Sequence, residues 1–560
     1  MLKPLLAGSM ARPIGIVLSG STSKKVIAQL YAEYEGKVRE GEFCFVHLRE
    51  HEVKLLGRIN RIIPYSDFFE EGDAWSEARR KMVQIPTEIS RRFYTLEIEV
   101  LGEVWSGSLS EASIPPPPGS EVSRFESEKE VLEIIEFKGE EKALVKFGRL
   151  FGYKEVPFFL DLDALPMHMA ILGVTGSGKS YTVGYLIEQL SDIKIGSLRT
   201  ALTTIIIDAH GDYIDYYEAF HYEGSRIGNY KDVIRFVFNK SLERINKGVK
   251  VITMDLDVFD ARELAELIMV YYTGGSLNEL QVAGLEMVLR RLREEGYNFS
   301  SLFLEPHDYN KLISELDVAR ENKLIHEQTL QAIKRALNKF EEDVMRTYEL
   351  VAYRDMVTFG SQFIDKVTDP KNPCLVLVDF SADGAPGVSL QLKQLVVSYI
   401  TKLLLKTFTD YKMNRIDRIL LLIIEEAQNY CPNLDAYPIG YSLARNNLAQ
   451  IATQGRKFGL SLCLVSQRPS FVDQIVLSMV NTYIIHRVSA GDVPFIKRVA
   501  GGLPEVIEDK LVSLATGRAI ITGQMNKLGF PVIVDIPEER KVRPRRGRIS
   551  VSDILAGKAQ

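Results

Sequence analysis

The chain of 560 residues has few cysteines, two tryptophans and no long apolar run. Its four cysteines, Cys44, Cys374, Cys431 and Cys463, lie far apart and lack the paired spacing of a zinc site or a disulfide framework. We therefore expect buried thiols in a reducing compartment. No apolar run approaches the roughly 18 residues that span a bilayer, and the apolar stretch at the start is too short for a signal peptide. These absences predict a cytoplasmic protein without a membrane partner.

The chain also lacks an overall positive charge. Lysine and arginine together number 69, aspartate and glutamate 74, and the formal net charge is −5. A nucleic-acid partner would therefore have to meet a local basic patch or a pore rather than the whole surface. The length allows two to four domains with a large buried core.

The clearest motif present is a phosphate-binding loop. Residues 173–180 read GVTGSGKS, which has the G-x-x-x-x-G-K-S spacing. Glycines let backbone N–H groups face an anion, the lysine adds a positive charge, and the serine hydroxyl is a ligand for Mg²⁺. An apolar strand before the loop and helical spacing after it place the phosphates at a helix N-terminus. The predicted nucleotide ligands here are Gly173, Thr175, Gly176, Ser177, Gly178, Lys179, Ser180 and Tyr181.

The pattern of apolar runs divides the chain into parts. Short β-type runs with turn-like breaks at the start are typical of a small barrel, and the stiff segment PPPPGS follows them. Apolar strands alternating with helices then predict an α/β core, which a mostly helical stretch interrupts. The predicted domains are a barrel at 1–115, the core at 116–257 and 356–535, an insertion at 258–355, and a basic arm at 536–560. The arm is a candidate for contact with DNA or a partner, or is solvated.

Two further apolar strands end in carboxylates. The run that ends at Asp208 is followed by Asp212, and each aspartate either orders Mg²⁺ or the attacking water or caps a turn. The run Ile419–Ile424 is followed by Glu425 and Glu426. Opposite a phosphate-binding loop, we expect Glu425 to support the Mg²⁺ shell and Glu426 to polarise the attacking water.

A further strand, Leu460–Val465, has functional candidates at both ends. Gln467 follows its carboxyl end and is a candidate sensor of the γ-phosphate. Arg456 precedes the strand and is a candidate arginine finger for a neighbouring subunit's nucleotide, a contact worth roughly a thousandfold in rate. The alternative for Arg456 is a surface ion pair.

In their order, these motifs resemble the HerA family of DNA translocases, in the HerA–FtsK branch of RecA-like P-loop ATPases. The resemblance covers nearly the whole chain and rests on ILGVTGSGKS, IIIDAHGDY, LLLIIEEAQNY and GRKFGLSLCLVSQRPS. It implies a RecA-like α/β core with a helical insertion and an N-terminal all-β barrel. It also implies a homo-hexamer that uses ATP and Mg²⁺ to pump double-stranded DNA through a central pore, in DNA end processing and recombinational repair. The implied partner is a NurA-type nuclease that docks on the barrel.

Carried over by position, the resemblance implies a catalytic set and places one more segment beside the nucleotide. Residues Val534 to Pro537 would lie against the nucleotide, in the proposed base pocket. Gln428 departs from the family's usual histidine, so no role is assigned to it. The implied catalytic residues are Lys179, Glu425, Glu426, Gln467 and Arg456, and those at the metal are Ser180 and Glu425.

Two other classes of function compete with this interpretation. One is a related ring ATPase that moves protein or serves a conjugation or defence machine, although such proteins usually bring membrane segments. The other is a nucleotide-switched assembly platform with little turnover, against which the intact Lys179, Glu426 and Gln467 argue. Under the DNA-pumping interpretation, the candidate pore cations are Arg445, Lys457 and Lys527.

Overall fold

The structure is a computed structural model that describes residues 12–48, 53–72, 74–86, 92–105, 108–125, 128, 130–131, 143–238, 243, 246–381 and 387–542. The chain forms two compact units, Met1–Lys138 with Arg149–Phe158 and Gly139–Gly148 with Phe159–Gln560. Among the described residues, no helix is both long enough and apolar enough to cross a membrane.

The first unit contains a closed β-barrel. Six antiparallel strands follow one another in the order β2-β1-β7-β3-β4-β5, and β5 pairs again with β2, which closes the barrel. Closure leaves no free strand edge around the ring. The strands are β1 (Pro13–Val17), β2 (Lys25–Leu30), β3 (Phe43–His47), β4 (Lys54–Tyr65), β5 (Phe93–Trp105), β7 (Glu121–Arg124) and the added β6 (Ser108–Ser110).

The predicted all-β barrel is therefore present. Its side chains alternate as a barrel requires, for example with Val26, Ala28 and Leu30 of β2 buried and the residues between them more exposed. Strand β7 belongs to the barrel although it follows residue 115, the end of the predicted barrel domain. A short helix, α1 (Ser76–Arg80), lies in the long connection between β4 and β5.

The second unit is built on one large sheet that is parallel from β19 to β15, the last strand of its order. Eight parallel strands run in the order β19-β10-β18-β17-β13-β16-β14-β15. Every residue of β10, β13, β16, β17, β18 and β19 is buried, which explains their apolar runs. These strands are β10 (Met169–Leu172), β13 (Thr204–Asp208), β14 (Asp232–Val237), β15 (Val249–Val251), β16 (Cys374–Asp379), β17 (Leu420–Ile424), β18 (Leu460–Ser466) and β19 (Thr482–Ile485).

Beyond β19 the sheet continues with antiparallel pairs. Strand β20 pairs with β19 and with β21, and the order then continues through β8, β11 and β12. These strands are β8 (Leu144–Leu150), β11 (Ile193–Ile195), β12 (Leu198–Thr200), β20 (Arg518–Thr522) and β21 (Val532–Asp535), and β9 (Pro157–Asp161) follows β8.

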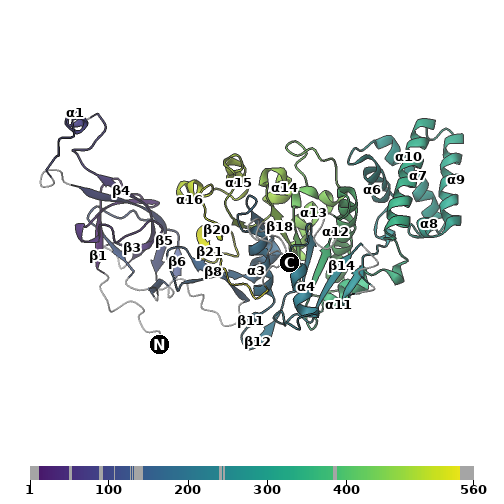
Figure 1. The fold of residues 1–560 in the computed structure, drawn as a ribbon, viewed down its shortest axis with the longest axis horizontal. Coiled ribbons are helices and arrows are strands. Elements are labelled where there is room, and N and C mark those ends of the chain that lie inside the picture. Colours follow the sequence, from purple (N-terminus) through teal and green to yellow (C-terminus); the bar gives the residue numbers. More distant parts are fainter. Residues whose placement is uncertain are drawn as a thin grey trace, which may run out of the picture. The chain divides into compact units, whose positions relative to one another are not determined.

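Helices cover this sheet and form the predicted insertion between β15 and β16. The insertion helices gather in one bundle (Figure 1), and their apolar faces are part of the unit's main core. Asp260 starts the bundle with a reciprocal cap. Its carboxylate accepts from the Glu263 N–H, and the Glu263 carboxylate accepts from the Asp260 N–H. The bundle contains α6 (Ala261–Thr273), α7 (Glu279–Glu294), α8 (Ser301–Leu304), α9 (Pro306–Glu321) and α10 (Glu327–Phe340). The core helices are α3 (Lys179–Leu190), α4 (Ile214–His221), α11 (Ser361–Val367), α12 (Leu390–Met413), α13 (Leu443–Gln454), α14 (Gln474–Ser478), α15 (Val493–Val499) and α16 (Glu505–Lys510).

The end of the described chain docks on α3. The Arg540 side chain is buried, its Nη2 donates to Tyr216 Oη at 2.6 Å, and its guanidinium carbon lies 5.3 Å from the ring centroids of Tyr181 and Tyr216. Its Nε lies 3.6 Å from the Glu188 carboxylate. Gly184 makes this possible, because a Cβ there would lie 2.3 Å from the guanidinium.

The backbone after Arg540 is held by the same carboxylate. The N–H groups of Lys541 and Val542 donate to Glu188 at 2.8 and 3.0 Å. The predicted basic arm thus begins inside the ATPase unit, and Arg540 is not available for the DNA-binding or solvated role expected of the arm. The rest of the arm, residues 543–560, lies outside the described residues.

Gly184→Ala should destabilise the protein, although alanine normally favours a helix by about 1 kcal/mol over glycine. The methyl group would displace Arg540 and leave the Glu188 carboxylate with a poorer partner, so we expect a net loss of about 1–3 kcal/mol. The midpoint of thermal unfolding measures this. In an Arg540→Ala background the same substitution should be neutral or stabilising, and an unchanged loss in that background would contradict the contact.

Candidate active site

The phosphate-binding loop connects β10 to α3 with a backbone that requires glycine. Gly176 and Gly178 have φ of +74° and +111°, where a side chain would be strained. At Gly173 a Cβ would lie 2.7 Å from both the Cβ of His486 and the Oγ of Ser177. The loop glycines that the sequence singled out are therefore set by backbone conformation and by close packing.

A buried histidine supports the loop from behind. His486 Nδ1 lies 2.9 Å from the Arg518 carbonyl oxygen, and its Nε2 lies 2.9 Å from Thr182 Oγ1. Because a carbonyl only accepts, Nδ1 carries the proton and Nε2 accepts from the threonine hydroxyl. Burial lowers the pKa of His486 to about 4, so the ring is neutral. Nothing in the sequence marked this residue, because its partners are far away in the chain.

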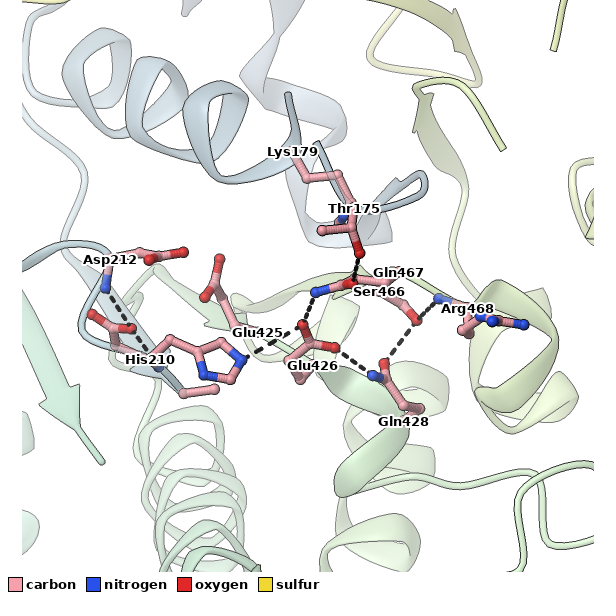
Figure 2. Close-up of polar contacts among 12 residues, drawn as sticks. Thr175, Lys179, His210, Asp212, Glu425, Glu426, Gln428, Ser466, Gln467 and Arg468 are labelled. Carbon is pink, nitrogen blue, oxygen red and sulfur yellow. Dashed lines mark hydrogen bonds and ion pairs between the residues drawn. The ribbon is translucent and has the colours of Figure 1, made fainter. Parts of the chain in front are cut away.

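The strand order explains how Gln467 reaches both halves of the site. Strand β18 lies between β10 and β17, so the residue after its carboxyl end lies between the phosphate-binding loop and the glutamate pair. Thr175 Oγ1 donates to Gln467 Oε1, and Gln467 Nε2 donates to Glu426 Oε1 (Figure 2). Gln467 therefore connects the loop directly to Glu426.

Six of the predicted site residues line one small cavity at the carboxyl ends of these strands. Lys179 is largely buried, and its Nζ donates to the Val174 carbonyl at 3.0 Å. Burial lowers the pKa of Lys179, while the charges of Glu426, Glu425 and Asp212 oppose that shift. The lining residues are Lys179, Ser180, His210, Asp212, Glu425, Glu426, Val465, Ser466 and Gln467.

Glu426 has an unusual backbone and a firmly held carboxylate. Its φ is +49°, a left-handed conformation that is uncommon outside glycine and clusters at functional sites. Burial raises the pKa of its carboxyl, but contacts with His210, Gln428 and Gln467 outweigh burial and lower it. The carboxylate is therefore ionised near neutral pH and suited to accept a proton.

Glu425 has the opposite environment. It is buried, accepts from the Tyr213 hydroxyl, and has its pKa raised well above the ordinary value by burial and by the charges of Asp208 and Asp212. A divalent cation in the cavity would relieve this crowding of carboxylates. The hard oxygens of Ser180 and Glu425 fit Mg²⁺, which takes few protein ligands beside substrate phosphates. The described residues contain no group of three or more His, Cys, Asp or Glu side chains that would hold a metal by itself.

The structure distinguishes the two candidate aspartates. Asp208 is fully buried, and its carboxylate accepts from four consecutive N–H groups, those of residues 210–213, at 2.8 to 3.2 Å. Burial and the charge of Asp379 raise its pKa to about 7. Asp208 thus caps the turn formed by residues 210–213, which is the turn-capping role predicted as the alternative to a Mg²⁺ or water ligand. Its carboxylate faces that turn rather than the cavity. Asp212 lines the cavity.

His210 is a site residue that sequence reasoning missed. Its Nε2 lies 3.8 Å from Glu426 Oε1, and this contact raises the pKa of the imidazole (Figure 2). It lies in the turn held by Asp208, within the polar cluster that follows β13. Because β13 pairs with β17, the turn after β13 lies next to the glutamate pair after β17, and only this pairing identifies His210 as a site residue.

Arg456 lies at the other end of β18 from Gln467. It is exposed in the short helix η7 (Gly455–Lys457), which precedes the strand. The length of β18 separates it from its own chain's cavity by roughly 20 Å, which exceeds the reach of an arginine side chain. Arg456 therefore does not complete the site of its own subunit.

Two of the candidate pore cations have partners within the chain. Arg445 Nη2 lies 2.6 Å from Asp473 Oδ2, and Lys527 forms an ion pair with the buried Asp161. Lys457 is exposed.

The predicted base-pocket segment lies close to the loop. The Ile536 N–H donates to the Gly517 carbonyl at 2.8 Å, and the Gly517 nitrogen is 3.5 Å from where a Cβ of Gly178 would be. Gly517 therefore lies between the segment Val534 to Pro537 and the phosphate-binding loop.

Comparison with known proteins assigns the central part of the chain. Residues 145–404 match the family model described as "Helicase HerA, central domain". These residues are therefore similar to that domain, and they make up a little under half of the chain. The chain is 26% identical over 531 residues to the DNA double-strand break repair helicase HerA of Sulfurisphaera tokodaii, which covers 93% of this chain and 92% of that protein. It is 27% identical over 531 residues to the protein of the same name from Saccharolobus solfataricus, and this match covers 94% of this chain and 92% of that protein.

The predicted resemblance to the HerA family is confirmed by these matches, which extend well beyond the HerA central domain. With its phosphate-binding loop and glutamate pair, the chain is a P-loop ATPase. Among solved structures, VirB4 of Thermoanaerobacter pseudethanolicus is similar over 70% of this chain and 96% of that one, with 14% identity and a TM-score of 0.44. That likeness bears on neither substrate nor partner.

Asp208→Ala and Asp212→Ala should have different effects, although both residues follow one strand. Loss of the Asp208 carboxylate leaves four N–H groups without an acceptor, so we expect a loss of about 3 kcal/mol or more of stability. Asp212→Ala should leave stability within about 0.5 kcal/mol and lower only ATP hydrolysis. Chemical denaturation and steady-state hydrolysis of both variants measure this. Equal destabilisation by the two would contradict the assigned roles.

Proposed function

We propose that this protein is an ATP-driven translocase and helicase on double-stranded DNA that works as a homo-hexameric ring. The observation that carries the proposal is the Thr175–Gln467–Glu426 connection, in a chain that matches DNA double-strand break repair helicases along more than nine tenths of its length. This connection joins the loop that binds phosphates to the carboxylate that acts on water. Such a link couples the state of the nucleotide to the strand tips around it.

The proposed roles follow from the position of each side chain. The loop N–H groups and Lys179 hold the phosphates of ATP, and Ser180 with Glu425 holds Mg²⁺, which neutralises phosphate charge when bound. Glu426 orients the attacking water and takes its proton. Gln467 lies where it contacts both Glu426 and the loop, as expected of a γ-phosphate sensor.

The distance of Arg456 from its own cavity supports a shared active site. In a ring, the edge that carries Arg456 in one subunit faces the nucleotide edge of the next, and the guanidinium stabilises the transferring phosphoryl group there. Hydrolysis then changes the contact between subunits and moves DNA-binding groups in the pore. The pore contacts are to phosphates, which makes them independent of sequence and sensitive to salt.

The names of the relatives support a place in DNA double-strand break repair. By resemblance to the HerA family, the proposed partner is a NurA-type nuclease that meets the N-terminal barrel, so that the motor supplies DNA ends for degradation.

Linear duplex DNA should stimulate ATP hydrolysis severalfold, and the stimulation should fade between about 50 and 200 mM salt because phosphate contacts release counterions. Lys179→Ala and Glu426→Gln should each lower turnover by about a hundredfold or more. Glu321→Gln, the same chemical change at an exposed glutamate of the insertion, is the matched control. Hydrolysis that neither duplex nor single-stranded DNA affects would contradict the translocase and favour a protein-handling ring ATPase.

Mixing two inactive variants tests the shared site. Glu426→Gln and Arg456→Ala subunits in equal amounts should restore up to about a quarter of wild-type turnover. With random mixing, about a quarter of the interfaces pair an intact Glu426 of one subunit with an intact Arg456 of the next. Arg335→Ala, at an exposed arginine of the insertion, is the control for Arg456→Ala and should be fully active alone. If Arg456 acts in its own subunit, the mixture stays as inactive as its components.

A further inference from the structure

The side-chain amide of Gln428 makes two polar contacts, both with residues that line the active-site cavity. Its Nε2 donates to Glu426 Oε2, and its Oε1 accepts from Ser466 Oγ at 2.8 Å (Figure 2). Gln428 and Ser466 are both buried. The amide thus bridges the turn after β17 and the carboxyl end of β18.

The orientation of this amide is fixed by its neighbours. The backbone N–H of Arg468 donates to Ser466 Oγ at 3.2 Å, so the serine hydroxyl is free to donate onward to Gln428 Oε1. An ionised carboxylate only accepts, which requires the NH₂ group of the amide on the side of Glu426. The Gln428 amide therefore has one satisfactory orientation, because a flipped amide would place its Oε1 against Glu426 Oε2, and both of these oxygens only accept.

The two oxygens of Glu426 are held from opposite sides. Gln467 donates to Oε1 and Gln428 donates to Oε2. The glutamate needs this support, because its left-handed backbone is an unfavourable conformation for a residue with a side chain. With one donor on Oε2, a lone pair of that oxygen is left to accept from water.

We propose that Gln428 is a positioning residue for ATP hydrolysis, which fixes the Glu426 carboxylate toward the attacking water while Ser466 sets the direction of the amide. The proposal rests on the proposed role of Glu426. An amide does not titrate near neutral pH, so this support is the same across the working range. Gln428 lies one residue beyond the pair of glutamates and is absent from the cavity lining, so it acts through Glu426.

Substitutions at Gln428 should alter kcat and leave nucleotide binding nearly unchanged. Gln428→Ala removes one anchor and should lower kcat by about tenfold to a hundredfold, with KM for ATP within about twofold. Gln428→Glu puts a second carboxylate beside Glu426 and should lower kcat further. Ser466→Ala frees the amide to turn and should give a smaller loss in kcat than Gln428→Ala.

Gln428→His distinguishes a positioning role in hydrolysis from a purely structural role. Imidazole has a donor and an acceptor nitrogen, so this variant should keep most of its kcat at pH 8, where the ring is neutral. As the pH falls toward 6 the ring gains a proton, donates from both nitrogens and lowers the basicity of Glu426. Wild type already has His210, whose pKa is raised, beside Glu426. Gln428→His adds a second imidazole there, so its kcat should fall more steeply than that of wild type as the pH is lowered.

The experiment measures kcat and KM for ATP between pH 6 and 8.5, with the melting temperature of every variant. Gln331→Ala is the matched control, because Gln331 donates to Glu327 on an exposed helix of the insertion in the same amide–carboxylate pairing. An unchanged kcat in Gln428→Ala, or losses that follow the melting temperature, would overturn the proposal. If Glu426→Gln keeps its activity, the role of Glu426 fails instead.

Discussion

The active site depends on the parallel pairing of buried strands in the order β10-β18-β17-β13. Because parallel strands end at one edge of the sheet, the four segments that follow them meet there although they are distant in the chain. Strand β18 in the middle brings Gln467 between the phosphate-binding loop and Glu426. A different strand order would leave the same motifs intact in sequence and separate them in space.

That convergence concentrates negative charge, and the structure assigns each carboxylate a separate partner. Asp208 is satisfied by backbone N–H groups and Asp379 by the buried Arg235, at 2.6 Å. Glu425 accepts from Tyr213 and keeps a raised pKa, whereas Glu426 has amide donors and a lowered one. Two adjacent glutamates on one turn thereby acquire different chemistry, since desolvation dominates at one and hydrogen bonding at the other.

The sequence predicted the loop, the strand tips and the fold class well, because those signals are local: spacing in GVTGSGKS and apolar runs of strand length. It did not distinguish a turn-capping Asp208 from a ligand, since both look the same at a strand end. It also missed His210 and the contacts of Gln428, which depend on which strands become neighbours. The docking of Arg540 on Tyr216 joins residues 324 apart in the chain, and no local pattern encodes such a contact.

The same docking has a mechanical consequence. Gly184, which makes room for Arg540, lies on the helix whose first turn contains Lys179 and Ser180. Glu188, on the same helix, holds Arg540 and the N–H groups of Lys541 and Val542, so the end of the described chain is attached to that helix. One helix therefore carries both the phosphate site at its N-terminus and the anchor of the chain's last described residues further along.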